Sequence, residues 1–419
     1  MELKKSNKTK KQQFKKELQM YFITFVLMPI ITVPAAIYQY CNSKGLDKKN
    51  ITFLFVALAC YMAVINASKF PGGDQANYWA VYMKVPQEGL IWAINHIYGY
   101  RDSTEGKEFM NGFYNFFGYY LTAGRYGLYI FINTILVYIP FFYVIKELYQ
   151  DKKNGKYAIL AGIICLCFFT QFFNLTIHLQ RQVLAFSIFI FAMYRKAKTG
   201  KTNYLLLFVA IFTHSTILFF IPFLYFNLFY ERMTIKRVIQ VLVLGLAIIF
   251  VVSRIMMAKE IEQMSDNALS YSLNRIHNGG GTDDVEFHLA NFLVFNIPIL
   301  YVSVKRMFLK GLNRMEYVVN NTYLLLFIFV LSFTGNDLVQ YRFSFFTYGY
   351  IGFLLPALLK GSNRYCKTYY LIISVFFVAR FYLTFDQITW SYDPIWKSLL
   401  FPEFINTLFP GYGDISKYL

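Results

Sequence analysis

Long runs of apolar residues recur along most of the chain, from residue 20 to residue 385. Each run is about as long as a helix that crosses the ~30 Å hydrocarbon core of a bilayer. A single run could be the buried helix of a soluble protein, but the repetition predicts an all-α, polytopic membrane helix bundle of about ten to twelve spans. The clearest runs are residues 51–67, 126–145, 157–173, 238–253, 287–304, 317–333 and 369–385.

Basic residues are concentrated in the short links between these runs, and this pattern predicts the orientation. Lys and Arg gather on cytoplasmic loops, so we expect the basic links inside and the less basic stretches outside. The large loops at about residues 68–125 and 254–286 are then external. The basic links are residues 44–49, 146–156, 195–201, 232–237, 305–314 and 360–367.

Two segments do not fit as simple spans. Both flanks of residues 108–122 are predicted to be external, so we expect an amphipathic or re-entrant helix there. Residues 203–230 begin and end at basic links, so we expect two short helices that turn near His214 and Ser215.

The chain is predicted to form one membrane domain, residues 20–385, between a basic cytoplasmic or interfacial tail (residues 1–19) and an external tail (residues 386–419). The first apolar segment leaves a conflict, because the lysine-rich tail and the first basic link both favour the cytoplasm. Pro29 and Pro34 permit a broken helix that does not cross, and the crossing and non-crossing alternatives both stay open.

Composition supports a membrane protein. Hydrophobic residues make up 57% of the chain and charged residues 15%, below the ~25% charged residues of typical soluble domains. The net charge of +18 follows the loops, which favours anionic lipid headgroups as partners and argues against nucleic acid. The 46 Phe and 35 Tyr suit interfacial anchoring or cavities for sugar rings and lipid tails.

The first external loop carries a candidate carboxylate. Gly72 and Gly73 permit a tight turn before Asp74, and Tyr78 follows four residues later on the same helical face. A carboxylate beside a membrane cavity can act as a general base, whereas the alternative is that Asp74 only caps the following helix.

A polar cluster begins a later span on its outer side. His178 shares a helical face with Arg181 and with Gln182. A guanidinium at the edge of the hydrocarbon can bind a phosphate or diphosphate at two points, or it can simply extend to the interface.

Two further arginines are candidates for the same anion site. Arg342 follows Tyr341 at the start of a span and either binds phosphate or pairs with Asp337. Arg125 lies beside a glycine turn. Several arginines at one membrane face would form a coherent anion site.

Two other segments have both structural and functional interpretations. His214 lies in an apolar segment and either makes a structural hydrogen bond at the helix break or takes part in catalysis. Residues 279–286 with His288 resemble a metal-binding segment. Asp283 and Glu286, however, have the spacing of an N-terminal capping box before an apolar helix, so we expect no metal site.

These motifs, in this order, resemble the EpsG-type family of bacterial exopolysaccharide and O-antigen polymerases of the Wzy class. That family shows G-[T]-D-x-x-x-Y, R-[QS]-x-[LM]-A, a short basic loop, F-H-x-[ST] and a late R-x-x-x-[YF]. The chain departs from the pattern at Ser68, beside Lys69, where the family usually has an arginine. The matching residues are Gly73-Asp74 with Tyr78, Arg181 to Ala185, Phe212 to Ser215, and Arg342 with Phe346.

The resemblance implies a GT-C-like glycosyltransferase of the bacterial cytoplasmic (inner) membrane. It would join oligosaccharide units carried on undecaprenyl diphosphate at the outer face, with no cofactor or metal, and a flippase and a chain-length regulator of the same pathway would be partners. In that mechanism arginines stabilise the diphosphate leaving group and a carboxylate or histidine acts as base. The expected catalytic residues are Asp74, His214 and His178, and the expected substrate-binding residues are Arg181, Arg342, Arg125, Tyr78, Gln182 and Tyr341.

Other functions remain open at this point. A transporter or flippase for lipid-linked oligosaccharides would use the same arginines, but such proteins commonly consist of two similar halves, and the sequence has no clear internal repeat. A glycan ligase of related architecture would move a finished chain to another acceptor. A non-catalytic scaffold would tolerate loss of both Asp74 and Arg181.

Overall fold

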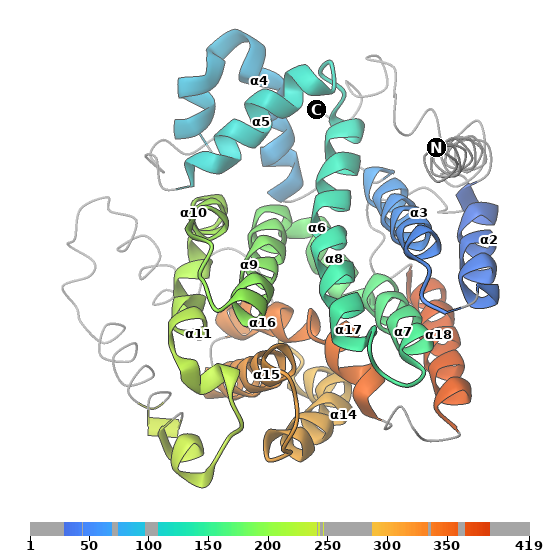
Figure 1. Cartoon of the computed structure of the whole chain (residues 1–419). Helices are drawn as coiled ribbons and strands as arrows, with labels where there is room; N and C mark the ends of the chain where they lie inside the picture. Colours follow the sequence, from blue (N-terminus) through green and yellow to red (C-terminus); the bar gives the residue numbers. More distant parts are fainter. Residues whose placement is uncertain are drawn as a thin grey trace, which may run out of the picture.

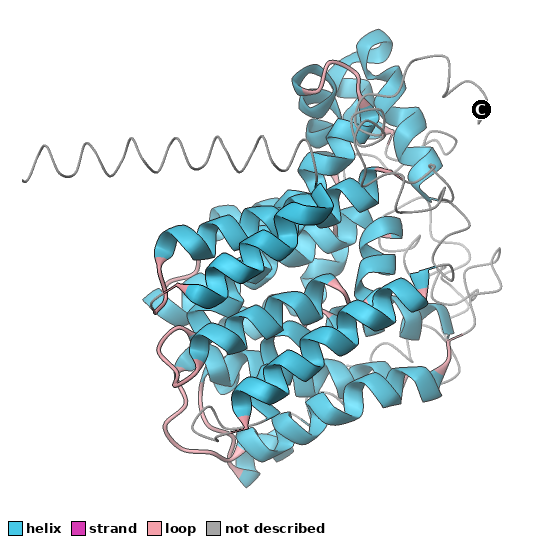
Figure 2. Cartoon of the chain, turned by 90° about the vertical axis from the view of Figure 1, so that its right-hand side faces the viewer, coloured by secondary structure: helices cyan, strands magenta, loops and turns pink. Residues whose placement is uncertain are grey.

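All regular structure in the described part of the chain is helical (Figures 1 and 2). The predicted tails and the external loop at about residues 254–286 lie outside the described residues. The computed structural model describes residues 29–43, 45–68, 74–96, 108–240, 242–243, 246, 287–333, 337–358 and 365–385.

The expected all-α membrane architecture is confirmed. Four described helices are long and apolar enough to cross a bilayer, and one bent helix pair could add a fifth span. The remaining predicted spans are shorter or more polar helices, or they lie outside the described residues. The four are α3 (Lys48–Ala67), α6 (Tyr126–Tyr149), α15 (Arg314–Ser332) and α18 (Cys366–Leu383).

The bent pair consists of α7 (Gly155–Cys167) and α8 (Thr170–His178), whose axes differ by 53°. The bend falls at Phe169, whose extended backbone interrupts the helix. At the other end of this pair, α9 (Gln180–Thr199) follows α8 after Leu179 alone. The chain therefore breaks twice on its way to Arg181.

Aromatic rings fill the centre of the bundle between α6, α8 and α9. The ring centroid of Phe172 lies 5.5 Å from that of Phe141 and 5.6 Å from that of Phe345, which belongs to α16 (Asp337–Tyr348). Nearby, α7 approaches α17 (Ile351–Leu354) closely. A Cβ on Gly162 would lie 2.5 Å from the carbonyl oxygen of Gly352, so this contact requires glycine.

The remaining helices enclose this centre. The first described helix, α2 (Pro29–Asn42), packs on α3 and continues through Pro34, so no break occurs at Pro34; the segment before Pro29 lies outside the described residues. On the other side, α14 (Leu289–Met307) packs on α15. A short 3-10 helix of one turn, η4 (Leu355–Leu358), follows α17.

Two helices cap one end of the bundle, at the top of Figure 1: α4 (Asp74–Asn95), which kinks at Gly89, and α5 (Phe109–Leu121). The short helix expected at residues 108–122 is thus confirmed. The two helices pack tightly because a Cβ on Gly112 would lie 2.5 Å from the Cα of Ile94. This contact fixes the beginning of α5 and, with it, Glu108.

The expected break near His214 is also confirmed. A short helix, α10 (Tyr204–Thr213), ends where His214 adopts an extended backbone conformation. The Lys196 ammonium donates a hydrogen bond to the Leu224 carbonyl, and this bond connects α9 to the helical segment that returns after the break. The returning segment consists of η1 (Ser215–Phe220), α11 (Ile221–Tyr225) and η2 (Asn227–Tyr230).

Three of the basic links predicted to be cytoplasmic meet through two carboxylates. Glu147 accepts hydrogen bonds from Lys146 (3.1 Å) and Lys198 (3.0 Å). Glu316 pairs with Lys152 (3.1 Å) and with Arg306 (2.7 Å). These contacts place the links at residues 146–156, 195–201 and 305–314 together, as the charge pattern requires.

Candidate functional site

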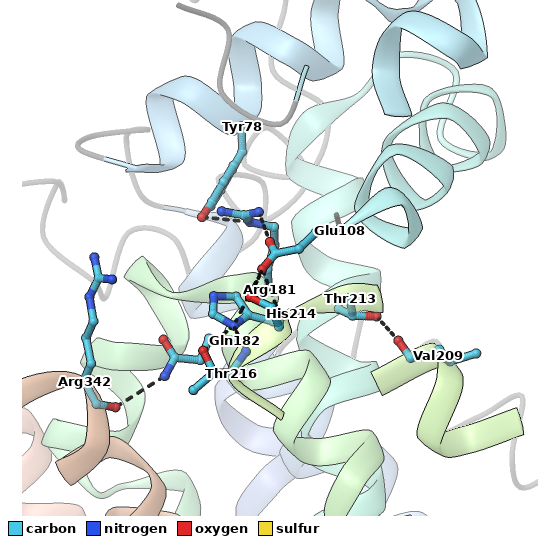
Figure 3. A network of polar contacts seen from close by, with 10 residues as sticks. Tyr78, Glu108, Arg181, Gln182, Val209, Thr213, His214, Thr216 and Arg342 are labelled. Carbon is cyan, nitrogen blue, oxygen red and sulfur yellow. Dashed lines mark hydrogen bonds and ion pairs between the residues drawn. The ribbon is translucent and has the colours of Figure 1, made fainter. Parts of the chain in front are cut away.

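Arg181 lies buried in the first turn of α9, with 5% of its surface exposed. Its Nη1 donates to the Glu108 carboxylate, and its Nε donates to the Tyr78 hydroxyl at 3.1 Å. The guanidinium also lies over the Tyr78 ring, 4.9 Å from the centroid. A buried arginine is stable only with such partners, and Figure 3 shows them converging on it.

Glu108 connects three elements of the fold. One carboxylate oxygen pairs with Arg181, while the other accepts hydrogen bonds from the Ser215 backbone N–H (2.9 Å) and hydroxyl (3.1 Å). Burial acts to raise the pKa of Glu108, but the charge of Arg181 and the hydrogen bonds from Ser215 hold the pKa below its usual value. Glu108 is therefore an ionised carboxylate at neutral pH.

His214 lies beside this carboxylate at the break between α10 and η1. Its Nδ1 is 3.9 Å from Glu108 Oε1, and it accepts a hydrogen bond from the Thr216 backbone N–H at 3.3 Å. Because a backbone N–H can only donate, the neutral imidazole carries its proton on Nε2. In this arrangement Nδ1 is occupied by Thr216 and Nε2 carries the proton that His214 can donate.

Gln75 holds α4 in place for this contact. It is buried, its Nε2 donates to the Ile177 carbonyl at 2.7 Å, and its Oε1 accepts from the Tyr126 hydroxyl at 2.9 Å. Tyr78 follows three residues later on the same helix. The network therefore positions the Tyr78 ring over Arg181.

The later arginine motif joins this site through the backbone. Gln182 is buried and its Nε2 donates to the Arg342 carbonyl at 3.3 Å, linking α9 to α16. Arg342 and Tyr341 are both partly buried. In Figure 3 the Arg342 side chain extends upward from its backbone carbonyl, and Tyr78 lies at the top of the same view.

These residues all lie within a match to a known family. The model of the EpsG family matches residues 52–394. The chain belongs to the EpsG family. This is a Wzy-like polysaccharide polymerase family. No curated protein and no solved structure matches the chain.

The structure therefore brings together Tyr78, Arg181, Gln182, His214 and part of Arg342 in this EpsG-family chain. Asp74 begins α4 and lies on the same helix as Tyr78. The structure describes the backbone of Asp74 but not its side chain. Arg125 is exposed just before α6.

One geometric prediction for the site is wrong. His178 was expected to share a helical face with Arg181 and Gln182, but α8 ends at His178 and α9 begins only at Gln180. The i, i+3 rule applies within a continuous helix, and the break at Leu179 removes that condition.

The predicted capping box, Asp283 with Glu286, lies outside the described residues. Phe287 and His288 precede the described helix, and α14 begins at Leu289 with His288 at its N-cap. Residues 279–286, the metal-like segment, lie outside the described residues. The capping box that the structure does contain is formed by Asn313 and Glu316 at the start of α15.

Sequence reasoning missed Glu108, the residue that connects Arg181 to the His214 break. One available signal was that a buried arginine requires an acidic partner. The other was that Glu108 immediately precedes the only short aromatic segment predicted to remain at the outer surface. The two signals together make Glu108 a candidate, although they do not single it out.

Proposed function

We propose that this EpsG-family protein is a polysaccharide polymerase that joins oligosaccharide repeat units carried on undecaprenyl diphosphate. The transfer would take place at the outer face of the bacterial cytoplasmic membrane. The observation that carries the proposal is the buried Arg181, held by Glu108 and Tyr78 beside the His214 break. It offers a preorganised cation where a diphosphate must leave.

In this mechanism the growing chain is transferred from its lipid diphosphate to a sugar hydroxyl of the next lipid-linked unit. The C–O bond to the diphosphate breaks, a new glycosidic bond forms, and the hydroxyl proton passes to a base. Arg181 and Arg342 stabilise the diphosphate, which carries more charge than Glu108 and competes with it for Arg181.

Two carboxylates are candidates for the base. Asp74 begins α4, one turn before Tyr78. Glu108 is ionised and in contact with Arg181, so movement of Arg181 toward a diphosphate would release a carboxylate oxygen beside the acceptor hydroxyl. His214, with its proton on Nε2, serves as a donor to the diphosphate.

His214→Asn is expected to separate the structural role of this residue from its chemical role. The Asn side chain can still accept from the Thr216 N–H, because Asn is a good N-cap residue, but it lacks an Nε2 proton at the imidazole position. Turnover should fall about ten- to hundredfold with little change in thermal unfolding. Unchanged turnover would show that His214 only caps η1.

Activity is expected to persist in excess EDTA. Arginines replace the metal that soluble sugar-nucleotide transferases use to hold a diphosphate. Product formation by detergent-purified protein, with and without EDTA, measures this directly. Activity that is abolished by EDTA and restored by a divalent cation would contradict the arginine mechanism.

The host organism provides the direct genetic test. Deleting the gene should abolish the long polysaccharide and leave single repeat units on the lipid carrier at the outer leaflet. If single units instead accumulate at the inner leaflet, the protein is a transporter. If long polymer forms on the lipid carrier but is not passed to its final acceptor, it is a ligase.

A further inference from the structure

An apolar groove of about 520 Å³ lies between α5 and α6. Its volume falls in the ~300–1,000 Å³ range of small-molecule sites. Gly118 shapes its floor, because a Cβ there would lie 2.5 Å from the Tyr129 ring. The principal lining residues are Phe109, Phe113, Phe117 and Leu121 from α5, and Tyr129, Ile132 and Leu136 from α6.

One end of this groove adjoins the charged site. Phe109 lines it and directly follows Glu108, which pairs with Arg181. Tyr114 also lines it, and the hydroxyls of Tyr114 and Thr213 are hydrogen-bonded at 3.2 Å, next to His214. An anion bound at Arg181 would therefore have an apolar surface immediately beside it.

The groove continues along a membrane span. Tyr129 and Leu136 are seven residues apart on α6, which corresponds to about 10 Å of helix. Leu136 is 49% exposed, Phe117 59% and Leu121 73%. Leu136 lies on α6, which is long and apolar enough to cross a bilayer, so its exposed side chain leaves the groove open to a lipid tail on that side.

We propose that this groove binds the isoprenoid tail of the lipid-linked substrate, next to the diphosphate. The inference rests on the proposed function and identifies where the carrier lies. An amphiphile whose anionic group is followed directly by a long apolar chain matches a buried arginine followed by an apolar groove. A bilayer phospholipid or a helix of another protein would not need the groove to begin at Phe109, beside the Glu108–Arg181 pair.

Photo-crosslinking tests the occupant without requiring turnover. The full-length protein in liposomes would carry p-benzoylphenylalanine at position 136, and the probe would be radiolabelled undecaprenyl diphosphate. We expect labelling that excess unlabelled undecaprenyl diphosphate removes and excess phospholipid does not. Position 371 is the matched control, since Leu371 is an exposed leucine (65%) on α18, another span outside the groove.

Equal labelling at positions 136 and 371, or labelling that phospholipid removes, would overturn the proposal. Specific labelling at position 136 in a protein that forms no polymer would uphold the carrier site but contradict the polymerase function. The two failures are therefore distinguishable.

A kinetic comparison addresses the tail itself. Leu136→Trp places a bulky ring in the groove and should raise the KM for a substrate with a full-length tail about tenfold. The KM for an analogue with a two-isoprene tail should change much less. Leu371→Trp should leave both unchanged. Equal effects of Leu136→Trp on the two substrates would show that the groove does not bind the tail.

Discussion

Arg181→Lys is expected to reduce polymerisation about 100- to 1,000-fold, the cost of losing one preorganised donor group to a developing anion. Lysine keeps the positive charge but lacks the planar fork that can bind two oxygens. It also cannot donate to Tyr78 and Glu108 in the arrangement that Arg181 adopts. Initial rates of chain extension in liposomes measure the loss.

The chain offers a close control for this substitution. Arg195 lies on the same helix, α9, but is exposed and close to the basic link that follows. Arg195→Lys should retain activity near that of the unmodified protein. If Arg181→Lys were equally active in folded protein, Arg181 would be a structural residue and the proposed mechanism would lose its principal cation.

Glu108→Gln is expected to lower turnover about 100-fold or more, the contribution of a positioned general base or of the group that orients the site. The amide oxygen can still accept from Ser215, but the amide NH₂ then faces the donors of Arg181. Removing one charge of a buried pair also destabilises, by about 3–5 kcal/mol. Turnover and thermal unfolding should therefore both be measured.

Glu147→Gln is the matched control, because Glu147 also accepts hydrogen bonds from cations but lies among the basic links. It should leave turnover close to that of the unmodified protein. A pH profile separates the roles of Glu108: if it is the base, its loss removes the acidic limb of the turnover curve. A Glu108→Gln variant that keeps turnover and the acidic limb would leave Asp74 as the remaining candidate.

The sequence was sufficient to predict the class of architecture and several local breaks. Hydropathy predicted the helical bundle, and charge predicted that the basic links lie on one side of the membrane. Three of them do meet, at Glu147 and Glu316. Two segments had both flanks assigned to the same side of the membrane, and this predicted the break at His214 and the short helix after Glu108. Each of these follows from the cost of placing charge or unpaired backbone in hydrocarbon.

The contacts within the site were less predictable. Periodicity assumes a continuous helix, and the break at Leu179 separates His178 from Arg181 in a way that no residue type indicates. Glu108 is 73 positions from Arg181 in the sequence, so only the tertiary packing of the helices brings them together. A single sequence identifies residues that require partners, such as Arg181, but not which distant residue supplies them.

The most direct measurement uses purified protein in liposomes with a defined undecaprenyl-diphosphate oligosaccharide and no nucleotide sugar. We expect a ladder of products at repeat-unit spacing, with release of undecaprenyl diphosphate, and almost no ladder from Arg181→Lys. Movement of intact substrate between leaflets without any ladder would contradict it and would assign Arg181 to a transport site.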